Sequence, residues 1–350
     1  MIPLTFVKIR IHRNLVEDKT RKCTKNPGEC YKMTDNIPTV NVIIPTYNRA
    51  HLIGRSIRSV LDQTYQDFEI IVVDDGSKDN TEEVVKAIND PRIIYLKQYK
   101  NLGAAATRNT GIKAAKGKFI AFQDSDDEWL PRKLEKQMEC FEKDSTGDLG
   151  LVVCDRISII KNQERYQLRR KRNLNYVQLL SHFTGLGVAT QCFLLKRDLV
   201  APELYFDERL RAWEEWDLMF RVSRICRIHV ISEPLVKRYL HGGDHVDVLG
   251  NRINAKKVLI RKYAEELTEN PKGLSYAHWQ IALDYYKIGD IKRVRLHMKK
   301  AVAAYPRNLD YLYQYTAAAL GRRVFKLAFN VRHAISVLFF RGGIRTGHGK

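Results

Sequence analysis

The feature that most constrains this fold is a series of short, β-branched apolar runs separated by segments of helical periodicity. Between the first two runs apolar residues recur at helical spacing, and residues 81–88 and 104–115 are helical in pattern too. Strands that alternate with single helices predict a doubly wound, mostly parallel α/β sheet. The first four runs are TVNVII (39–44), FEIIVV (68–73), RIIYL (92–96) and KFIAF (118–122), and LGLVVC (149–154) is expected to extend the sheet.

The rest of the chain divides by changes in composition. Within a helical C-terminal region, Tyr285, Gly289, Ala301 and Pro306 match one tetratricopeptide-like unit. A single unit cannot form a solenoid, so we expect a docked helical hairpin. The predicted organisation is an accessory arm at 1–38, an α/β domain at 39–250 with halves at 39–135 and 136–250, a helical region at 251–321, and a basic amphipathic tail at 322–350.

The chain is strongly basic, with 60 Lys and Arg against 40 Asp and Glu and a net charge of +20. Such an excess favours nucleic acid, an anionic membrane surface or phosphorylated small molecules as partners. No acid follows Asp310, and residues 322–341, within the basic tail at 322–345, alternate bases with apolar residues, as interfacial helices do. This tail is expected either to contact an anionic membrane or to pack on the α/β domain.

The location of the protein is predicted from what the sequence lacks. It shows no secretory signal, no uncharged apolar run long enough to span a membrane, and no CxxC pair among its six cysteines. We therefore expect a cytoplasmic protein, with peripheral attachment to the inner face of the cell membrane as a further hypothesis.

Polar clusters follow three of the predicted strands. They are PTYNR (45–49), DDGS (74–77) and QDSDD (123–127). In open α/β sheets ligands bind beyond the carboxyl ends of the strands, so the three clusters are expected to meet in one crevice. Each cluster alone could be a solvated turn, but three at successive strand ends favour a binding site.

The acidic cluster at 124–127 suggests a metal site. In an extended segment Asp124 and Asp126 point the same way, and their mutual repulsion is relieved by a divalent cation. Mg²⁺ or Mn²⁺ is usually held by one or two carboxylates, with phosphates and water completing the shell. The local alternative, compatible with the first, is that Asp127 caps a helix over 130–142.

The segment NLGAAATRNTGIKAAKG (101–117) is rich in glycine and alanine. Small side chains allow a helix to approach a ligand closely, and Arg108 within it is a candidate partner for a diphosphate. A plain packing helix is the alternative.

Together these stretches resemble the donor-binding half of the family-2 glycosyltransferases with the GT-A fold, of the bacterial polysaccharide and cell-surface glycan type. The resemblance covers about 40–135 closely and reaches loosely to about 245. It implies an inverting transfer from a nucleotide-activated sugar, with UDP the commonest carrier, to a glycan or lipid-linked acceptor. By this resemblance, Pro45, Thr46, Tyr47 and Arg49 border the nucleotide, Asp75 or Asp74 contacts the base, Asp124 beside Ser125 approaches the ribose, and Asp126, with Asp127 in reserve, binds Mn²⁺ or Mg²⁺.

The acceptor half should supply a general base. RAWEEWDLMFRVS (211–223) resembles the family's Glu-Asp-Trp-Asp segment, and alignment on Trp216 puts Glu215 where the family usually has a catalytic Asp. Because Glu is longer than Asp by one methylene, Glu214 and Asp217 are alternative candidates for the base. These acids could also simply stabilise the N-terminus of a helix, with no catalytic role. RYLHGGDHVD (238–247) resembles the family's late His-Gly segment, where His241 would complete the metal or phosphate shell, or else be an exposed loop residue.

Three other functions compete with that of a glycosyltransferase. A nucleic-acid-binding protein is suggested by the charge, but that charge lies mainly at 161–172 and in the tail, away from the acidic crevice. No aromatic-interleaved binding motif accompanies it, so we expect no nucleic-acid partner. A scaffold on a degenerate transferase fold would use the single helical hairpin. An NAD-dependent enzyme needs GxGxxG after the first strand, where PTYNRAH stands instead.

Overall fold

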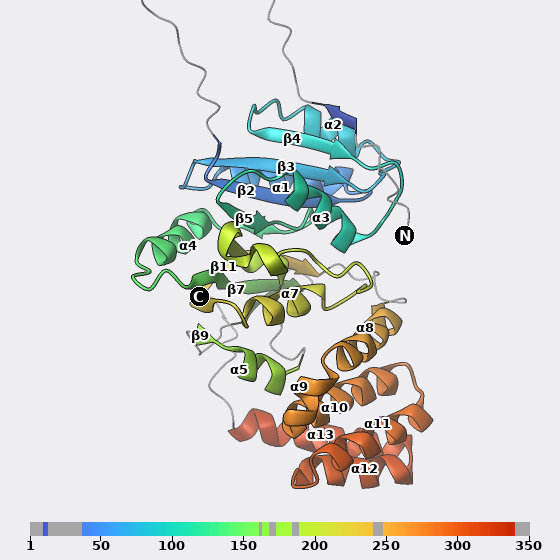
Figure 1. Cartoon of the computed structure of the whole chain (residues 1–350). Coiled ribbons are helices and arrows are strands. Elements are labelled where there is room, and N and C mark those ends of the chain that lie inside the picture. Colours follow the sequence, from blue (N-terminus) through green and yellow to red (C-terminus); the bar gives the residue numbers. More distant parts are fainter. Residues whose placement is uncertain are drawn as a thin grey trace, which may run out of the picture.

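The computed structural model describes residues 10–12, 37–160, 163–167, 173–183, 189–240 and 248–339. The first predicted runs form the strands of a parallel half-sheet, in the order β4-β3-β2-β5 (Figure 1). This order confirms the doubly wound α/β prediction for the first half of the domain. The strands are β2 (Val40–Thr46), β3 (Phe68–Asp74), β4 (Ile93–Lys97) and β5 (Phe119–Phe122).

Helices between these strands bury their apolar stripes against the sheet. In α1 (Ala50–Leu61) the buried stripe is formed by Ile53, Ile57 and Val60. In α3 (Ala104–Ala114) a Cβ added at Gly111 would lie 2.4 Å from Cγ2 of Ile43, so glycine is what lets this helix lie so close to β2. The third helix, α2, spans Thr81–Lys86.

The second half of the sheet is mixed. The predicted fifth run is the long strand β7 (Leu149–Ile160), but β10 (Phe193–Lys196) lies between β5 and β7 and is antiparallel to both. β11 (Arg227–Leu240) then pairs with β7 in parallel. The smaller elements are β6 (Glu128–Trp129), α4 (Lys133–Glu142), β8 (Gln163–Gln167), β9 (Asn173–Leu174), α5 (Tyr176–Ser181), η1 (Thr190–Cys192), α6 (Arg197–Val200), η2 (Ala201–Glu203) and α7 (Glu214–Val222).

The structure bears on two local expectations, the cap at Asp127 and the arm at 1–38. The cap prediction for Asp127 is wrong: α4 begins at Lys133 with Arg132 as its N-cap, because the short strand β6 intervenes. Of the predicted arm, β1 (Arg10–His12) pairs antiparallel with β4 and so adds an edge strand to the sheet. The remaining residues up to 36 lie outside the described part.

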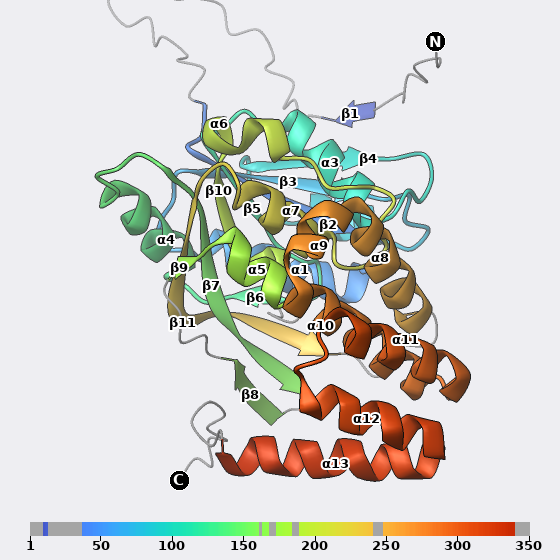
Figure 2. The same ribbon diagram turned by 60° about the horizontal axis from the view of Figure 1, so that its bottom comes forward.

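The C-terminal region is helical, as predicted. The expected hairpin over 275–308 is α10 (Pro271–Lys287) with α11 (Ile291–Ala304). A second antiparallel pair, α12 (Leu309–Leu320) with α13 (Arg322–Phe339), stacks beside it and forms the outer layer in Figure 2. α13 therefore packs on the helical region, where Phe325 is buried with its ring centroid 5.1 Å from that of Tyr286. None of the helices in the described ranges is long and apolar enough to cross a membrane.

The helical region shares the core of the sheet domain through α8 (Val248–Lys262) and α9 (Ala264–Glu269). Leu259 and Tyr263 belong to the main apolar cluster, and the Tyr263 ring lies 4.6 Å from that of Phe220 on α7. α8 is thus joined to the helix that carries the predicted acidic segment.

Candidate active site

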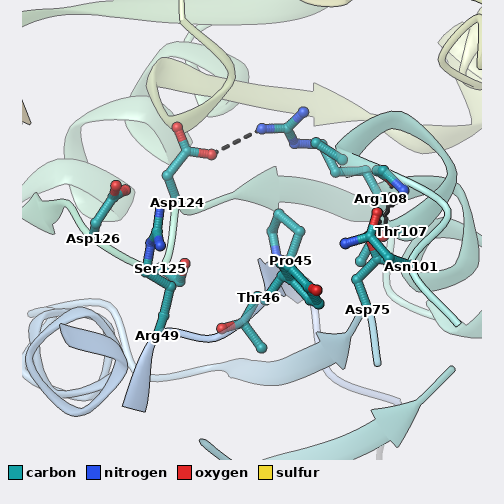
Figure 3. Close-up of a pocket in the computed structure, with 13 residues that line it drawn as sticks. Pro45, Thr46, Arg49, Asp75, Asn101, Thr107, Arg108, Asp124, Ser125 and Asp126 are labelled. Atoms are coloured by element: carbon teal, nitrogen blue, oxygen red, sulfur yellow. Dashed lines mark hydrogen bonds and ion pairs between the residues drawn. The ribbon is translucent and has the colours of Figure 1, made fainter. Parts of the chain in front are cut away.

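A cavity of about 330 Å³ lies at the carboxyl ends of β2, β3 and β5, against the N-terminus of α3 (Figure 3). The three polar clusters therefore meet at one edge of the sheet. Nine residues named from the sequence line this donor-side pocket: Pro45, Thr46, Tyr47, Arg49, Asp75, Arg108, Asp124, Ser125 and Asp126.

The two aspartates after β3 have different roles. Asp74 is fully buried and does not line the pocket; its carboxylate accepts hydrogen bonds from the Ser77 backbone N–H at 2.7 Å and from the Tyr95 hydroxyl. Burial and the hydrogen bond to Asp74 raise the pKa of Tyr95, so the hydroxyl stays a donor. Of the two alternatives for a contact to the nucleotide base, Asp75 lines the pocket and Asp74 does not.

Asp75 also shapes the loop that enters α3. Its two carboxylate oxygens accept the backbone N–H groups of Leu102 at 2.7 Å and Gly103 at 2.9 Å. The sequence analysis missed four residues of this loop and helix that line the pocket: Asn101, Gly103, Ala104 and Thr107. The glycine and alanine content of 101–117 indicated that this segment could approach a ligand closely, but composition does not say which residues of a helix face a cavity.

The acidic cluster at 124–127 separates into two faces. Asp124 and Asp126 line the donor-side pocket. Asp127 is 2% exposed and turns inward, where its carboxylate accepts the Tyr239 backbone N–H at 2.8 Å and the side-chain amide of Gln191. Burial, followed by the charges of Asp124 and Asp126, raises the pKa of Asp127. Asp127 is therefore a structural residue here, and its reserve role as a metal ligand does not fit its position.

Arg108 links the two halves of the domain. Its guanidinium lies 2.9 Å from a carboxylate oxygen of Asp124 and 3.0 Å from one of Glu214, and the residue is 6% exposed. The predicted diphosphate partner is therefore neutralised by two carboxylates, while it still lines the pocket. Two such charge-assisted contacts fix the distance between β5 and the start of α7.

A second cavity, of about 340 Å³, adjoins the first and shares Arg108 and Asp124 with it. Trp213, Glu214 and Glu215 line this acceptor-side pocket. Trp213 has a φ of 65°, a left-handed conformation that is strained for a bulky residue and is concentrated at functional sites. The strained turn presents both glutamates at the first turn of α7.

The three candidate bases differ in their surroundings. Glu214 is paired with Arg108, whereas Glu215 forms no ion pair with the described basic residues. Burial and the neighbouring Glu214 raise the pKa of Glu215 to about 8. Asp217 is fully buried on the other side of α7, where it accepts from Arg221 at 2.9 Å and Lys262 at 2.7 Å. Asp217 joins α7 to α8 and does not line the pocket, and His241 lies outside the described residues.

The described residues supply too few metal ligands to hold a divalent cation without a bound substrate. They contain no group of three His, Cys, Asp or Glu side chains arranged for a metal. Asp126 and Asp124 supply hard oxygen atoms at the end of β5, which suits a cation that takes most of its shell from a diphosphate and water. The donor set thus fits Mg²⁺ or Mn²⁺ bound together with a nucleoside diphosphate.

A GT-A-like sheet with a cavity at its strand ends, and a second pocket beside it that contains Glu214 and Glu215, fits the architecture of a glycosyltransferase. The sequence pattern of glycosyl transferase family 2 matches residues 41–201. An uncharacterized glycosyltransferase of Rickettsia prowazekii (strain Madrid E) is 32% identical over 249 residues, which is 68% of this chain and 76% of the relative. The chain belongs to glycosyl transferase family 2.

Two further likenesses are to a named relative and to a solved structure. The Escherichia coli protein WfgD, named as a UDP-Glc:alpha-D-GlcNAc-diphosphoundecaprenol beta-1,3-glucosyltransferase, is 48% identical over 164 residues, covering 47% of this chain and 62% of WfgD. The crystal structure of S. aureus TarS 1–349 with UDP-GlcNAc superposes with a TM-score of 0.61 at 16% identity, covering 89% of this chain and 98% of that one. The second likeness shows the fold, which includes a helical region after the sheet domain.

Proposed function

We propose that this glycosyltransferase moves a sugar from a UDP-linked donor to a lipid-linked acceptor by a single inverting displacement. One observation carries the proposal: the donor-side and acceptor-side pockets meet at the Arg108–Asp124 ion pair, with Glu215 on the acceptor side. A nucleotide sugar in the first pocket would then present its anomeric carbon towards the second. The complex of TarS with UDP-GlcNAc and the acceptor in the name of WfgD support the choice of donor and acceptor classes.

In this mechanism the chain's own residues position and deprotonate. The Glu215 carboxylate takes the proton of the acceptor hydroxyl, whose oxygen attacks the anomeric carbon as the bond to the diphosphate oxygen breaks on the opposite side. Because one displacement occurs, the anomeric configuration inverts. Asp126, with Asp124, would hold Mn²⁺ or Mg²⁺ beside the diphosphate, and the cation would neutralise the leaving group.

The donor class is tested by calorimetry and thermal shift with UDP, TDP, GDP, CMP and NAD, each with and without Mn²⁺. We expect one nucleoside diphosphate, UDP, to bind in a metal-dependent way, and Asp126→Ala to weaken that binding at least about tenfold, because a diphosphate site loses its bridging cation. Asp90→Ala is the matched control, because Asp90 lies between α2 and β4, pairs with Arg92 and does not line the pocket. No nucleotide binding by folded protein would contradict the proposal and favour the scaffold.

A membrane contact through α13 is proposed as well. Phe325 and Ala328 face inward, while Val324, Leu327 and Val331 are 39%, 64% and 43% exposed on an adjacent face of the helix. Arg323 and Lys326 are exposed beside this apolar stripe. An exposed apolar stripe flanked by bases is what an anionic bilayer surface binds.

Flotation with anionic and neutral liposomes tests this contact. Cutting the chain at 321 would remove the buried Phe325, so point variants are preferable. Lys326→Glu is expected to reduce flotation with anionic vesicles several-fold, since each basic residue near such a surface is worth about 1 kcal/mol. Leu327→Glu should reduce it further, and Leu296→Glu, on a half-exposed position of α11, should not. Equal flotation of all four proteins would refute the contact.

A further inference from the structure

The acceptor-side pocket carries more positive charge than a neutral sugar needs. Five arginines line it, and Arg108 among them is already paired with Asp124 and Glu214. Besides Asp124 and Glu214, the one acid among the described residues that line the pocket is Glu215. The other four arginines are Arg156, Arg211, Arg238 and Arg252.

These four arginines come from four separate parts of the chain. Arg156 lies on β7 and Arg238 on the neighbouring parallel strand β11, close to it in register. Arg252 lies on α8 with its guanidinium 5.3 Å from the Trp213 ring centre, and Arg211 precedes the strained turn. Arg211 also donates to the Leu102 carbonyl at 3.3 Å. A pocket lined by arginines from the sheet, a helix and a loop is not an ordinary solvated basic face.

The positions are also costly in free energy. Arg156 is 6% exposed, and Arg238 and Arg252 are only half-exposed. Arg252 has a carboxylate nearby outside the pocket lining, that of Asp284 at 3.9 Å. Like charges brought together in a partly buried pocket still repel one another, and an anion bound between them relieves the repulsion. A phosphate is the anion that matches the planar, two-pronged donor pattern of arginine.

We propose that these arginines bind a phosphate group of the acceptor, so that the enzyme selects anionic acceptors. The proposal rests on the proposed function, because it assigns the acceptor class of the same site. The donor's own diphosphate does not explain the cluster, since the donor-side pocket has Arg49 and Arg108 and none of these four. Two acceptor types share the chemistry: a sugar held on a lipid by a diphosphate, and a glycan that contains phosphodiesters.

The test uses the full chain saturated with UDP and Mg²⁺, so that the donor-side pocket is filled. Three probes are titrated by calorimetry: decyl diphosphate for the lipid carrier, a methyl-capped glycerol phosphodiester for the glycan, and decyl glucoside as the uncharged control. We expect at least one phosphate probe to bind and decyl glucoside to bind at least about tenfold more weakly. Preference between the two phosphate probes identifies the source.

The matched variants are Arg211→Gln with Arg252→Gln for the pocket, and Arg132→Gln for an exposed arginine on the surface before α4. Loss of contacts to a charged group predicts about a ten- to hundredfold weaker affinity for the phosphate probe in the double variant and none in the control. UDP affinity should be unchanged in both. Arg238→Gln is a second test if the double variant has a lowered unfolding temperature.

Three results would overturn the proposal: binding of neither phosphate probe, equal affinity for decyl glucoside, or variants that weaken UDP instead. The first two leave the proposed donor chemistry intact. Failure of the wild-type chain to bind UDP at the outset would instead refute the proposed function, so the two failures are distinguishable.

Discussion

Replacing Glu215 by glutamine is expected to lower kcat by about 10²–10⁴-fold, the usual contribution of a general base. The amide has nearly the same shape but cannot accept the proton of the acceptor hydroxyl. UDP affinity should stay the same, because Glu215 does not line the donor-side pocket. Initial rates at saturating donor and acceptor, together with UDP calorimetry, measure both quantities.

The comparison variants separate the three candidate bases. Glu214→Gln breaks the ion pair with Arg108 and should disturb both substrates, so KM values change along with kcat. Asp217→Asn should mainly reduce stability, since its carboxylate is held by Arg221 and Lys262. If Glu215→Gln kept more than about a tenth of the wild-type kcat, Glu215 would not be the base.

The pH profile gives an independent check on the same residue. Burial and Glu214 raise the pKa of Glu215 to about 8, so the carboxyl is mostly protonated at neutral pH in the free enzyme. A base must be ionised, and kcat/KM should therefore increase with pH and level off above about 8. Glu215→Asp is expected to shift this rise, whereas a profile already flat from pH 6 would exclude Glu215.

The donor half could be predicted from the sequence because its signals are local. A β-branched run followed at once by polar residues specifies both a buried strand and what stands at its end. Parallel strands then bring Asp75 and Asp124 to one edge whatever the details of the loops. The missed lining residues, such as Asn101 and Thr107, depend on how α3 is rotated about its axis, which a glycine- and alanine-rich helix does not fix by an apolar stripe.

The acceptor half is harder to predict from the sequence because its strands do not pair in chain order. β10 enters between β5 and β7, and β11 returns beside β7, through pairings that connect residues far apart in the sequence. The same long-range pairing decides the fate of Asp127, whose carboxylate is held by Tyr239 of β11 and Gln191. A run of three acids shows that charge is concentrated there, but which acid turns inward is set by those distant partners.

A repeat pattern in the sequence predicts the helical region, but nothing in the sequence indicates that this region contacts the site. In the structure α8 links them, since Arg252 lines the acceptor-side pocket and Lys256 lies 5.2 Å from the Trp213 ring centre. Stacked helical hairpins bury each other's apolar faces. The region therefore contributes to the acceptor side of the site as well as to the packing of the molecule.

Removing Asp284 is expected to destabilise the protein by about 3–5 kcal/mol, the cost of leaving a buried charge without its partner. Lys256 on α8 and Asp284 on α10 are 0% and 1% exposed and lie 2.7 Å apart. Arg252 and Lys287 also lie within 4 Å of the Asp284 carboxylate, at 3.9 Å and 3.8 Å. Asp284→Ala would therefore leave three cations near one another, and urea unfolding followed by circular dichroism measures the loss.

The loss should depend on pH in a definite direction. Burial lowers the pKa of Lys256 to about 8 even with Asp284 present, below its usual value of 10.5. Without Asp284 the pKa falls further, so at pH 9 the folded variant holds a neutral amine. The unfolded chain is protonated up to about 10.5, and the deficit relative to wild type is therefore largest near pH 6 and smaller at pH 9.

A paired replacement distinguishes an unpaired charge from a packing defect. Lys256→Met with Asp284→Leu removes both charges and keeps the volume, so its stability should return to within about 1–2 kcal/mol of wild type, as buried ion pairs replaced by apolar residues usually allow. Glu135→Ala, which breaks the exposed pair with Arg132, should change little. If Asp284→Ala and the double variant unfolded at the same low urea concentration, α8 and α10 would be held by packing alone. If both matched wild type, the buried pair would have no role in joining the helical region to the site.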